Sequence, residues 1–263
     1  MKIIRFQLQQ STGYGIVQDE SVFSIEGDIF DSFTSGKRLC RMSDARLLAP
    51  IQPRTIVGVG KNYRTFAVEA DKDMPTEPQV FLKSPSSIIG HLDNIVYPSI
   101  SNDVRCGGEL AVVIKHKAIR VSEEEALKYI LGYTCALDVS AFDIAERDTF
   151  VTRAKSFYSF CPLGPYIDTS ANVSNLRIAC RQNGVLKQQG STADMLFGIA
   201  RVIRHVTEFM ALQPGDLVLT GTNGSSFKVG GGDLVEVEID DIGCLKSMVI
   251  QEPDVGRHTT SEV

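Results

Sequence analysis

Two acidic residues stand beside apolar, β-forming residues, where a carboxylate could do chemistry. Asp138 lies inside the stretch "CALDVSAF", and Glu109 immediately precedes "LAVVI". An acid buried in a strand needs a partner or a metal, because an unpaired buried charge is costly. Asp138 is therefore a candidate site residue on the sequence alone. Glu109, taken alone, would most often be a solvated acid at the edge of a strand.

Other residues could belong to a site or have ordinary structural roles. Lys155, in "AKSF", could hold an anionic ligand or be a surface charge, and Thr222, in "GTNG", could contact a ligand or hold a turn. Asp143 is more typical of a structural hydrogen-bond acceptor. The four histidines form no constellation. His91, in "IIGHLDNI", could approach a site as a base, or it could be a loop histidine.

These residues must be positioned by strands. "RTIVGVGKNY" predicts a strand that ends in a glycine turn, and "YTCALDVS" predicts a buried strand. "LQPGDLVLTGTNG" and "GGGDLVEVEIDDIGCLKSMVI" each place a Gly-Asp turn before a β-rich run, which predicts hairpin-like closing strands. Residues 64–80 are polar and end in prolines, a pattern that suits a short helix or a mobile lid.

Two helices are predicted. Ser122 and Glu125 form a capping box before a helical pattern that stops near Gly132. The longest helix is expected within residues 191–212, where seven apolar residues fall on one core-packing stripe. They are Met195, Leu196, Ile199, Val202, Ile203, Val206 and Phe209. Strands outnumber helices without regular βαβ alternation, so the pattern predicts a mixed α+β fold.

The chain divides into three parts. Residues 1–52 read as a small N-terminal β domain, with strand-like runs "KIIRFQL" and "YGIVQDESVFSI" followed by a connector, "MSDARLLAPIQP". Residues 53–250 form the main domain, and the polar tail 251–263 is expected to fray. With 263 residues, 43% of them hydrophobic, the chain can bury a core of one domain of ~200 to 250 residues.

Composition excludes several classes of protein. The net charge of −5, without a Lys/Arg-rich block, argues against nucleic acid as a partner. The start turns polar after four residues and no apolar run approaches about 18 residues, so we expect no membrane partner and a cytoplasmic location. Gly58-Val59-Gly60 lacks the third glycine of a dinucleotide motif. The six cysteines are scattered, which indicates reduced, mostly buried side chains.

Five blocks of the sequence resemble the fumarylacetoacetate hydrolase family, in order and at about the family's separations, over about residues 53–250. They are "VGVGKNYRTFAVEA", "VFLKSPSSIIG", "GGELAVVIKHKAIRVSEEEALKYILGYTCALDVSAFD", "AKSFYSFCPLGP" and "LQPGDLVLTGT". The resemblance implies a mixed β-roll or barrel-like sandwich with a small N-terminal domain, in a homodimer. It also implies cleavage or rearrangement of carbon–carbon bonds in diketo and 2-oxo acids. A divalent cation, Mg²⁺ or Mn²⁺, held by three carboxylates, would stabilise the enolate charge.

The resemblance carries site residues onto this chain. The family's two glutamates separated by one residue map onto Gly107 and Glu109, so a glycine stands where a ligand is usual. The third ligand maps onto Asp138. The implied metal ligands are therefore Glu109 and Asp138, and the implied substrate contacts are Lys155 and Thr222. Lys155 is also implied as a catalytic residue.

The implied lid departs from the family pattern. The family has a His three residues beyond Tyr63 and a Glu three further on, and here these positions hold Phe66 and Glu69. Glu69 remains a candidate catalytic base without its histidine partner. Phe66 and Phe142, candidate substrate contacts, make the pocket more apolar together with Leu137, which hints at a larger or less charged ligand.

Three hypotheses follow. The leading one is metal-assisted isomerisation, decarboxylation or carbon–carbon bond hydrolysis of a small 2-oxo or β-diketo acid. Hydrolysis is least favoured because the lid His is missing. Two carboxylates and a chelating oxo acid could still complete the shell of Mg²⁺, so the metal is expected to be weakly bound or absent at rest. The alternatives are a binding protein that has lost its chemistry, and a metal-independent enzyme acting on a larger, more apolar ligand.

Overall fold

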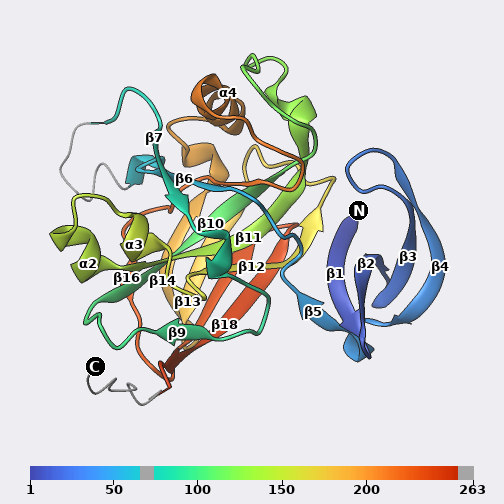
Figure 1. Ribbon diagram of the computed structural model, residues 1–263, viewed down its shortest axis with the longest axis horizontal. Helices are drawn as coiled ribbons and strands as arrows, with labels where there is room; N and C mark the ends of the chain where they lie inside the picture. The colour runs from blue at the N-terminus through green and yellow to red at the C-terminus, as the bar shows by residue number, and fades with distance from the viewer. Residues whose placement is uncertain (66–73, 254–263) are drawn as a thin grey trace, which may run out of the picture.

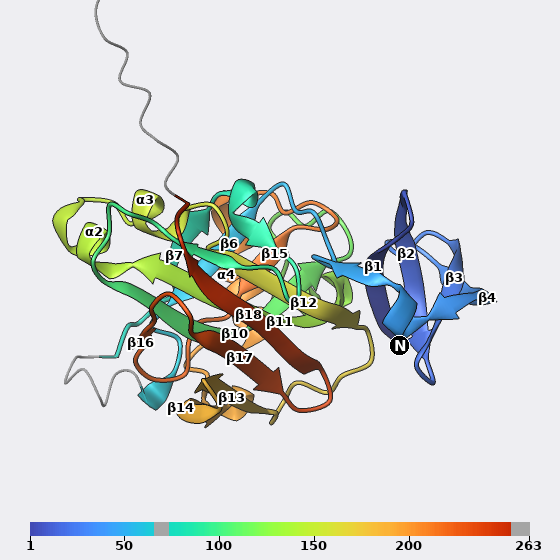
Figure 2. The same ribbon diagram turned by 90° about the horizontal axis from the view of Figure 1, so that it is seen from below.

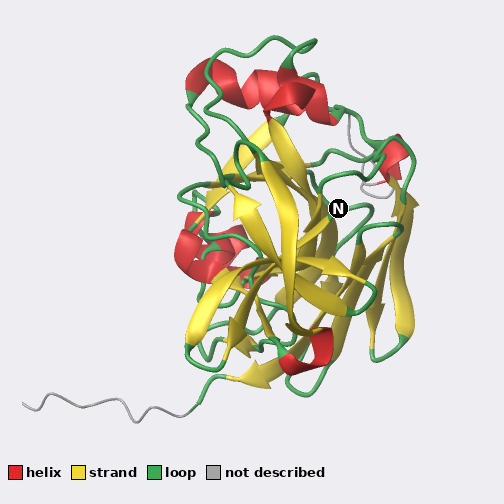
Figure 3. Cartoon of the chain, turned by 90° about the vertical axis from the view of Figure 1, so that its right-hand side faces the viewer, coloured by secondary structure: helices red, strands yellow, loops and turns green. Residues whose placement is uncertain are grey.

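In the part of the chain that the structure describes, strands in two open sheets make up most of the regular secondary structure, and helices cover the periphery (Figure 3). The structure, a computed structural model, describes residues 1–65 and 74–253. No helix in these two ranges is long and apolar enough to cross a membrane. All six cysteines are free, and four of them are buried. The fold is the α+β arrangement with an N-terminal β domain that the sequence predicts, although its sheets do not close into a barrel.

The N-terminal strands form a unit at one end of the molecule (Figures 1 and 2). Four of them make an antiparallel meander, β1 (Lys2–Leu8), β2 (Ser11–Gln18), β3 (Ser21–Gly27) and β4 (Phe33–Arg41). The predicted connector is partly wrong, because it contains a 3-10 turn and a strand, β5 (Arg46–Leu48), which pairs with β1. Leu47, in β5, packs against the small core formed by the buried Ile4, Phe6 and Val22.

The larger sheet continues from β1 into the main domain, in the order β4-β3-β2-β1-β12-β11-β10-β15-β6-β7. Three short strands, β5, β8 and β16, pair at its sides. The bounds of the main-domain strands are β6 (Ile56–Gly60), β7 (Gln79–Lys83), β8 (Ile88–Ile89), β10 (Val104–Ile114), β11 (Ile130–Ala141), β12 (Cys161–Asp168), β15 (Leu217–Leu219) and β16 (Phe227–Lys228). The predicted strands at "RTIVGVG" and "YTCALDVS" are thereby confirmed.

The smaller sheet packs against one face of β10 and β11. Its order is β14-β13-β17-β18-β9. The bounds are β9 (Ile95–Tyr97), β13 (Arg177–Gln182), β14 (Val185–Ser191), β17 (Leu234–Ile239) and β18 (Gly243–Gln251). The predicted closing hairpin is confirmed for β17 and β18. It is wrong for β15, which pairs with β10 and with β6.

The two faces of β10 have different surroundings because side chains alternate along a strand. Cys106 and Leu110 belong to the core shared with the smaller sheet. Ala111, on the opposite face, packs with Leu217 and Leu219 of β15 in a second core. Gly107 and Glu109 lie on that second face. The candidate site is therefore built on the side of the large sheet that faces away from the smaller one.

The helices depart from the sequence-based expectation. The helical pattern after Ser122 gives only a 3-10 turn, η3 (Ala126–Tyr129), because Ile130 already pairs with β10 as the start of β11. The long helix, α4 (Ile199–Phe209), begins only after Gly198, and the exposed Phe209 does not join its buried stripe. Two short helices, α2 (Phe142–Arg147) and α3 (Thr152–Lys155), follow β11.

Candidate active site

The pairing of β10 with β11 brings the two predicted acids onto one face. Asp138 lies directly opposite Gly107, and Glu109 lies opposite Ala136, two residues along the same face. Residues directly opposite in an antiparallel pair have neighbouring side chains. The sheet register therefore explains why the carboxylates of Glu109 and Asp138 come close together, although the sequence separates them widely.

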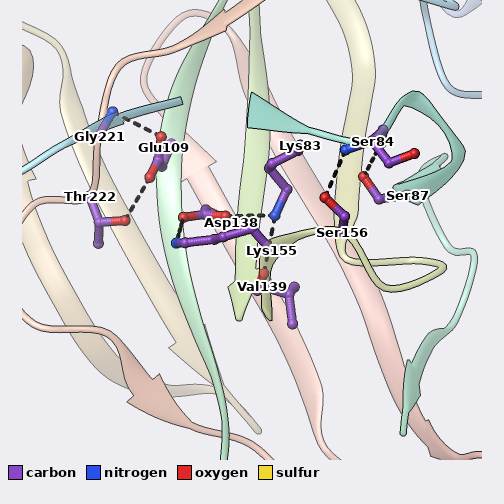
Figure 4. Close-up of polar contacts among 10 residues, drawn as sticks. All are labelled: Lys83, Ser84, Ser87, Glu109, Asp138, Val139, Lys155, Ser156, Gly221 and Thr222. Carbon is purple, nitrogen blue, oxygen red and sulfur yellow. Dashed lines mark hydrogen bonds and ion pairs between the residues drawn. The ribbon is translucent and has the colours of Figure 1, made fainter. Parts of the chain in front are cut away.

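Asp138 is held by two lysines (Figure 4). The Nζ of Lys83, at the end of β7, donates to Asp138 Oδ1 at 2.7 Å and to the carbonyl oxygen of Val139 at 3.1 Å. The Nζ of Lys155, at the end of α3, donates to Asp138 Oδ2. Burial acts to raise the pKa of Asp138, but the two neighbouring ammonium groups outweigh it and lower that pKa below its ordinary value. Asp138 is therefore an ionised, ion-paired carboxylate at neutral pH.

The carboxyl group of Glu109 has neutral partners. Its Oε2 accepts a hydrogen bond from the backbone N–H of Gly221 at 2.8 Å, and its Oε1 accepts one from Thr222 Oγ1 at 2.8 Å. Only 2% of the residue is exposed. Burial, together with the charge of Asp138, raises the pKa of Glu109 to about 8, although Lys155 and the two hydrogen bonds act to lower it. Glu109 can therefore exchange a proton near neutral pH.

A hydrogen bond ties together the two segments that carry the lysines. Ser84 and Ser156 each follow a lysine, and the backbone N–H of Ser84 donates to Ser156 Oγ at 2.9 Å. The hydroxyl of Ser87 in turn donates to the carbonyl oxygen of Ser84 at 2.6 Å. These bonds fix the end of β7 against the end of α3. They explain how Lys83 and Lys155 reach the same carboxylate from different elements.

The glycine at position 107 makes room for Thr222. A Cβ atom on Gly107 would lie 2.6 Å from Thr222 Cγ2 and 3.0 Å from Thr222 Cβ, with Oγ1 closer still. Such separations are well inside van der Waals contact. The space that a side chain at position 107 would need is therefore filled by Thr222, whose hydroxyl is bonded to Glu109.

The two carboxylates of this cluster fall short of the set of three that the family resemblance implies for a divalent cation. Mg²⁺ takes six oxygen ligands in near-ideal octahedral geometry. Across residues 1–65 and 74–253, no group of three His, Cys, Asp or Glu side chains could hold a metal ion. All four carboxylate oxygens of Glu109 and Asp138 already accept hydrogen bonds, two of them from ammonium groups.

The structure brings four of the predicted site residues together and leaves others apart. Glu109, Asp138, Lys155 and Thr222 form the cluster. Phe142 lies at the start of α2, where the guanidinium of Arg105 stacks 3.8 Å from its ring centroid. The candidate lid residues, Phe66 and Glu69, are outside the described residues.

The other candidates have structural contacts away from the cluster. His91 Nδ1 accepts a hydrogen bond from the backbone N–H of Lys246 at 3.2 Å. Asp143 accepts hydrogen bonds from Ser101 Oγ at 2.6 Å and from the N–H of Asn102 at 3.2 Å. These are the loop and acceptor roles that the sequence offered for them.

Sequence reasoning missed Lys83. Its side chain is fully buried, and its two described partners come from β11, 55 and 56 residues along the chain. One signal could have identified it. Lys83 ends the apolar run "VFL", where a lysine needs an acidic partner if it is buried.

Two domain families match the chain. Residues 55–250 match the fumarylacetoacetate (FAA) hydrolase C-terminal family, and residues 1–50 match the Rv2993c-like N-terminal family. The oxaloacetate tautomerase YisK of Bacillus subtilis is 34% identical, with 81% of this chain and 76% of that protein covered. The mitochondrial oxaloacetate tautomerase fahd2 of Xenopus laevis is 38% identical, with 82% and 72% covered.

Solved structures show the same fold. The crystal structure of 5-carboxymethyl-2-hydroxymuconate delta-isomerase from Mycobacterium smegmatis superposes with a TM-score of 0.89 at 32% identity. The match covers 96% of this chain and all of that one. The likeness therefore extends over the N-terminal unit as well as the domain that carries the cluster.

Proposed function

Because the chain belongs to the fumarylacetoacetate hydrolase family, we propose that it is an isomerase that interconverts the keto and enol forms of a small 2-oxo acid. Relatives named as oxaloacetate tautomerases and a hydroxymuconate isomerase support this class of reaction. A 2-oxo dicarboxylic acid such as oxaloacetate is the proposed substrate. Its reaction needs a proton acceptor near C3 and a cation near the C2 oxygen.

The observation that carries the proposal is the pairing of a partly exposed ammonium group with two carboxylates in different surroundings. Lys155 is 18% exposed, whereas Glu109 and Asp138 are buried beside it. Asp138 is ion-paired, and Glu109 has neutral hydrogen-bond partners. Carboxylates whose environments push their pKa values apart take different roles in acid and base catalysis. Asp138 would position the lysines, and Glu109 would exchange the proton.

The proposed steps balance with one proton. Glu109, as a carboxylate, removes a proton from C3, and the electron pair of the broken C–H bond moves to the C2 oxygen. Lys155 stabilises the developing oxyanion and gives it a proton. The enol leaves with one proton on oxygen in place of one on carbon. Transfer of a proton from Glu109 to Lys155 through solvent restores both groups.

A tautomerisation assay tests this proposal. The wild-type protein is mixed with freshly dissolved enol-oxaloacetate, and the loss of the enol's ultraviolet absorbance is followed. Lys155→Met should lower kcat/KM by ~10² to 10³, the usual effect of removing one donor to an oxyanion. Lys128→Met is the matched control, because Lys128 is 70% exposed and pairs with Glu125 on the surface. Equal rates for Lys155→Met and Lys128→Met would contradict the proposal.

The same assay separates tautomerisation from decarboxylation. Coupled detection of pyruvate reports loss of carbon dioxide, whereas tautomerisation changes the enol signal alone. Fast decay of the enol without pyruvate is the expected result. Pyruvate formed at the rate of enol loss would instead assign the chain to the decarboxylases.

A further inference from the structure

We infer that this site binds its oxo acid directly on Lys155, supported by Lys83, without a divalent cation. The inference rests on the proposed function, because it concerns how the same site holds the substrate of that reaction. Three independent features of the cluster lead to it: its charge balance, the space beside Gly107 and the different exposure of the two lysines.

The charge balance disfavours a cation. The two lysines contribute +2 and Asp138 −1, so the four groups sum to zero when Glu109 is ionised and to +1 when it is protonated, and in neither case is the cluster negative. A site for a divalent cation would instead concentrate negative charge. A dication ligated by Asp138 would also have to displace Lys83 or Lys155 from one of its oxygens. An anionic ligand needs no concentration of negative charge and displaces no lysine. It can approach an ammonium group that stays bonded to Asp138.

The space beside Gly107 offers no place for a third carboxylate ligand. Thr222 fills this space, and its hydroxyl donates to Glu109. A serine or threonine hydroxyl is a neutral ligand and does not replace the lost negative charge. The donor set therefore cannot be completed by a small rotation of a neighbouring acid among the described residues.

The two lysines differ in their freedom to contact a ligand. Lys83 has a fully buried side chain and donates to Asp138 and to the carbonyl oxygen of Val139. Lys155 is partly exposed, and its Nζ lies over the ring of Phe81, 4.6 Å from the centroid. An ammonium group has three N–H donors, so Lys155 can keep its hydrogen bond to Asp138 and still donate another to a substrate oxygen. Lys155 is therefore the substrate-contacting lysine, and Lys83 is a positioning residue that acts through Asp138.

Oxalate, a planar dianion that resembles the enolate of an oxo acid, is the probe that tests this inference. The full chain is stripped of metal and titrated calorimetrically with oxalate in EDTA, and then with excess Mg²⁺ or Mn²⁺. The dissociation constant in EDTA should agree with that in metal within about threefold. Lys155→Met should weaken binding about 10- to 100-fold, the usual effect of losing a hydrogen bond to a charged group. Lys128→Met should leave it unchanged.

Two outcomes would overturn the inference. One is oxalate binding that appears only when Mg²⁺ or Mn²⁺ is present. The other is the absence of oxalate binding under every condition in a wild-type protein that is folded by circular dichroism. Binding in EDTA without any tautomerisation would support the inference and contradict the proposed function, so the two failures are distinguishable.

The role of Lys83 needs a readout that a purely structural residue would not change. Lys83→Met should weaken oxalate binding less than Lys155→Met, because Lys83 donates to Asp138 and to the carbonyl oxygen of Val139, whereas Lys155 is the more exposed of the two. A Lys83→Arg variant, which keeps the charge, should restore the affinity in part. Wild-type affinity in a folded Lys83→Met variant, or no recovery in Lys83→Arg, would reject the positioning role.

Discussion

Replacing Asp138 with Asn should destabilise the protein strongly, because the carboxylate compensates two cations in a buried place. The side chain of Asp138 is 6% exposed, that of Lys83 is fully buried and that of Lys155 is 18% exposed. Removing one partner of a buried ion pair leaves an uncompensated charge and typically costs about 3 to 5 kcal/mol. We expect Asp138→Asn to lower the free energy of unfolding by about this amount, mainly through Lys83.

A double-mutant cycle measures how much of this free energy of unfolding comes from the ion pair between Lys83 and Asp138. Lys83→Met removes the buried ammonium and leaves Asp138 paired with Lys155, so it should cost less than Asp138→Asn. In the double variant the fully buried ammonium is gone, and only the partly exposed Lys155 is left without its anion. The sum of the two single effects should therefore exceed the double effect by about 0.5 to 3 kcal/mol, the range found for residues in contact. Urea unfolding followed by circular dichroism gives all four free energies at pH 7.

Acid provides an independent check on the same carboxylate. The pKa of Asp138 in the folded protein lies below its ordinary value of 3.8. The unfolded chain thus binds more protons in that range, and the stabilisation from Asp138 is present above pH 3.8 and is lost as the pH falls through the folded pKa. The gap in stability between wild type and Asp138→Asn should shrink on acidification below that value. Additive single effects, or a gap that does not shrink in acid, would refute the ion-paired description of this cluster.

Two further changes test the surroundings of Glu109. The pKa of Glu109 is raised from 4.5 to about 8, so between these pH values the folded state holds a proton on Glu109 that the unfolded chain has lost. The free energy of unfolding should therefore fall by up to about 1.4 kcal/mol per pH unit as the pH rises from 4.5 to 8. Urea unfolding measured from pH 4.5 to 8 should show this slope in the wild type and not in Glu109→Gln. Equal slopes in the two proteins would contradict the raised pKa of Glu109. Gly107→Ala should destabilise by about 1 to 3 kcal/mol through overpacking against Thr222, and Thr222→Ala should recover part of that loss. Gly13→Ala, whose Cβ would meet nothing within 4 Å, is the control and should change stability by no more than about 0.5 kcal/mol; a similar effect for both alanines would refute the packing argument.

The sequence predicted the strands of the site better than its helices. The apolar runs around Glu109 and Asp138 are long enough to mark β10 and β11 without knowledge of their partners. The capping signal at Ser122 is local, and it fails because the residues from Ile130 onward gain a full ladder with β10. Local propensity is outweighed there by tertiary pairing.

The partners of the two acids lay beyond sequence reasoning. A carboxylate buried in a strand needs a partner or a metal, but the sequence does not say which of the two Asp138 has. The answer depends on the ends of β7 and α3 meeting over β11, and the hydrogen bond between Ser84 and Ser156 that joins them has no sequence signature of its own. The closeness of Thr222 to Gly107 likewise depends on the loop after β15 crossing β10.

The glycine at position 107 and the lysine pair are best understood together. A carboxylate at that position would lie opposite Asp138 on the same face, adding a third negative charge beside two cations. With glycine there, the cluster carries no net negative charge, and Thr222 occupies the space and donates a hydrogen bond to Glu109. A cluster without net negative charge does not attract a metal cation, and its most exposed charge is the ammonium of Lys155. An anionic oxo acid is therefore the ligand for which this arrangement is complementary, and proton transfer through Glu109 requires nothing that these residues lack.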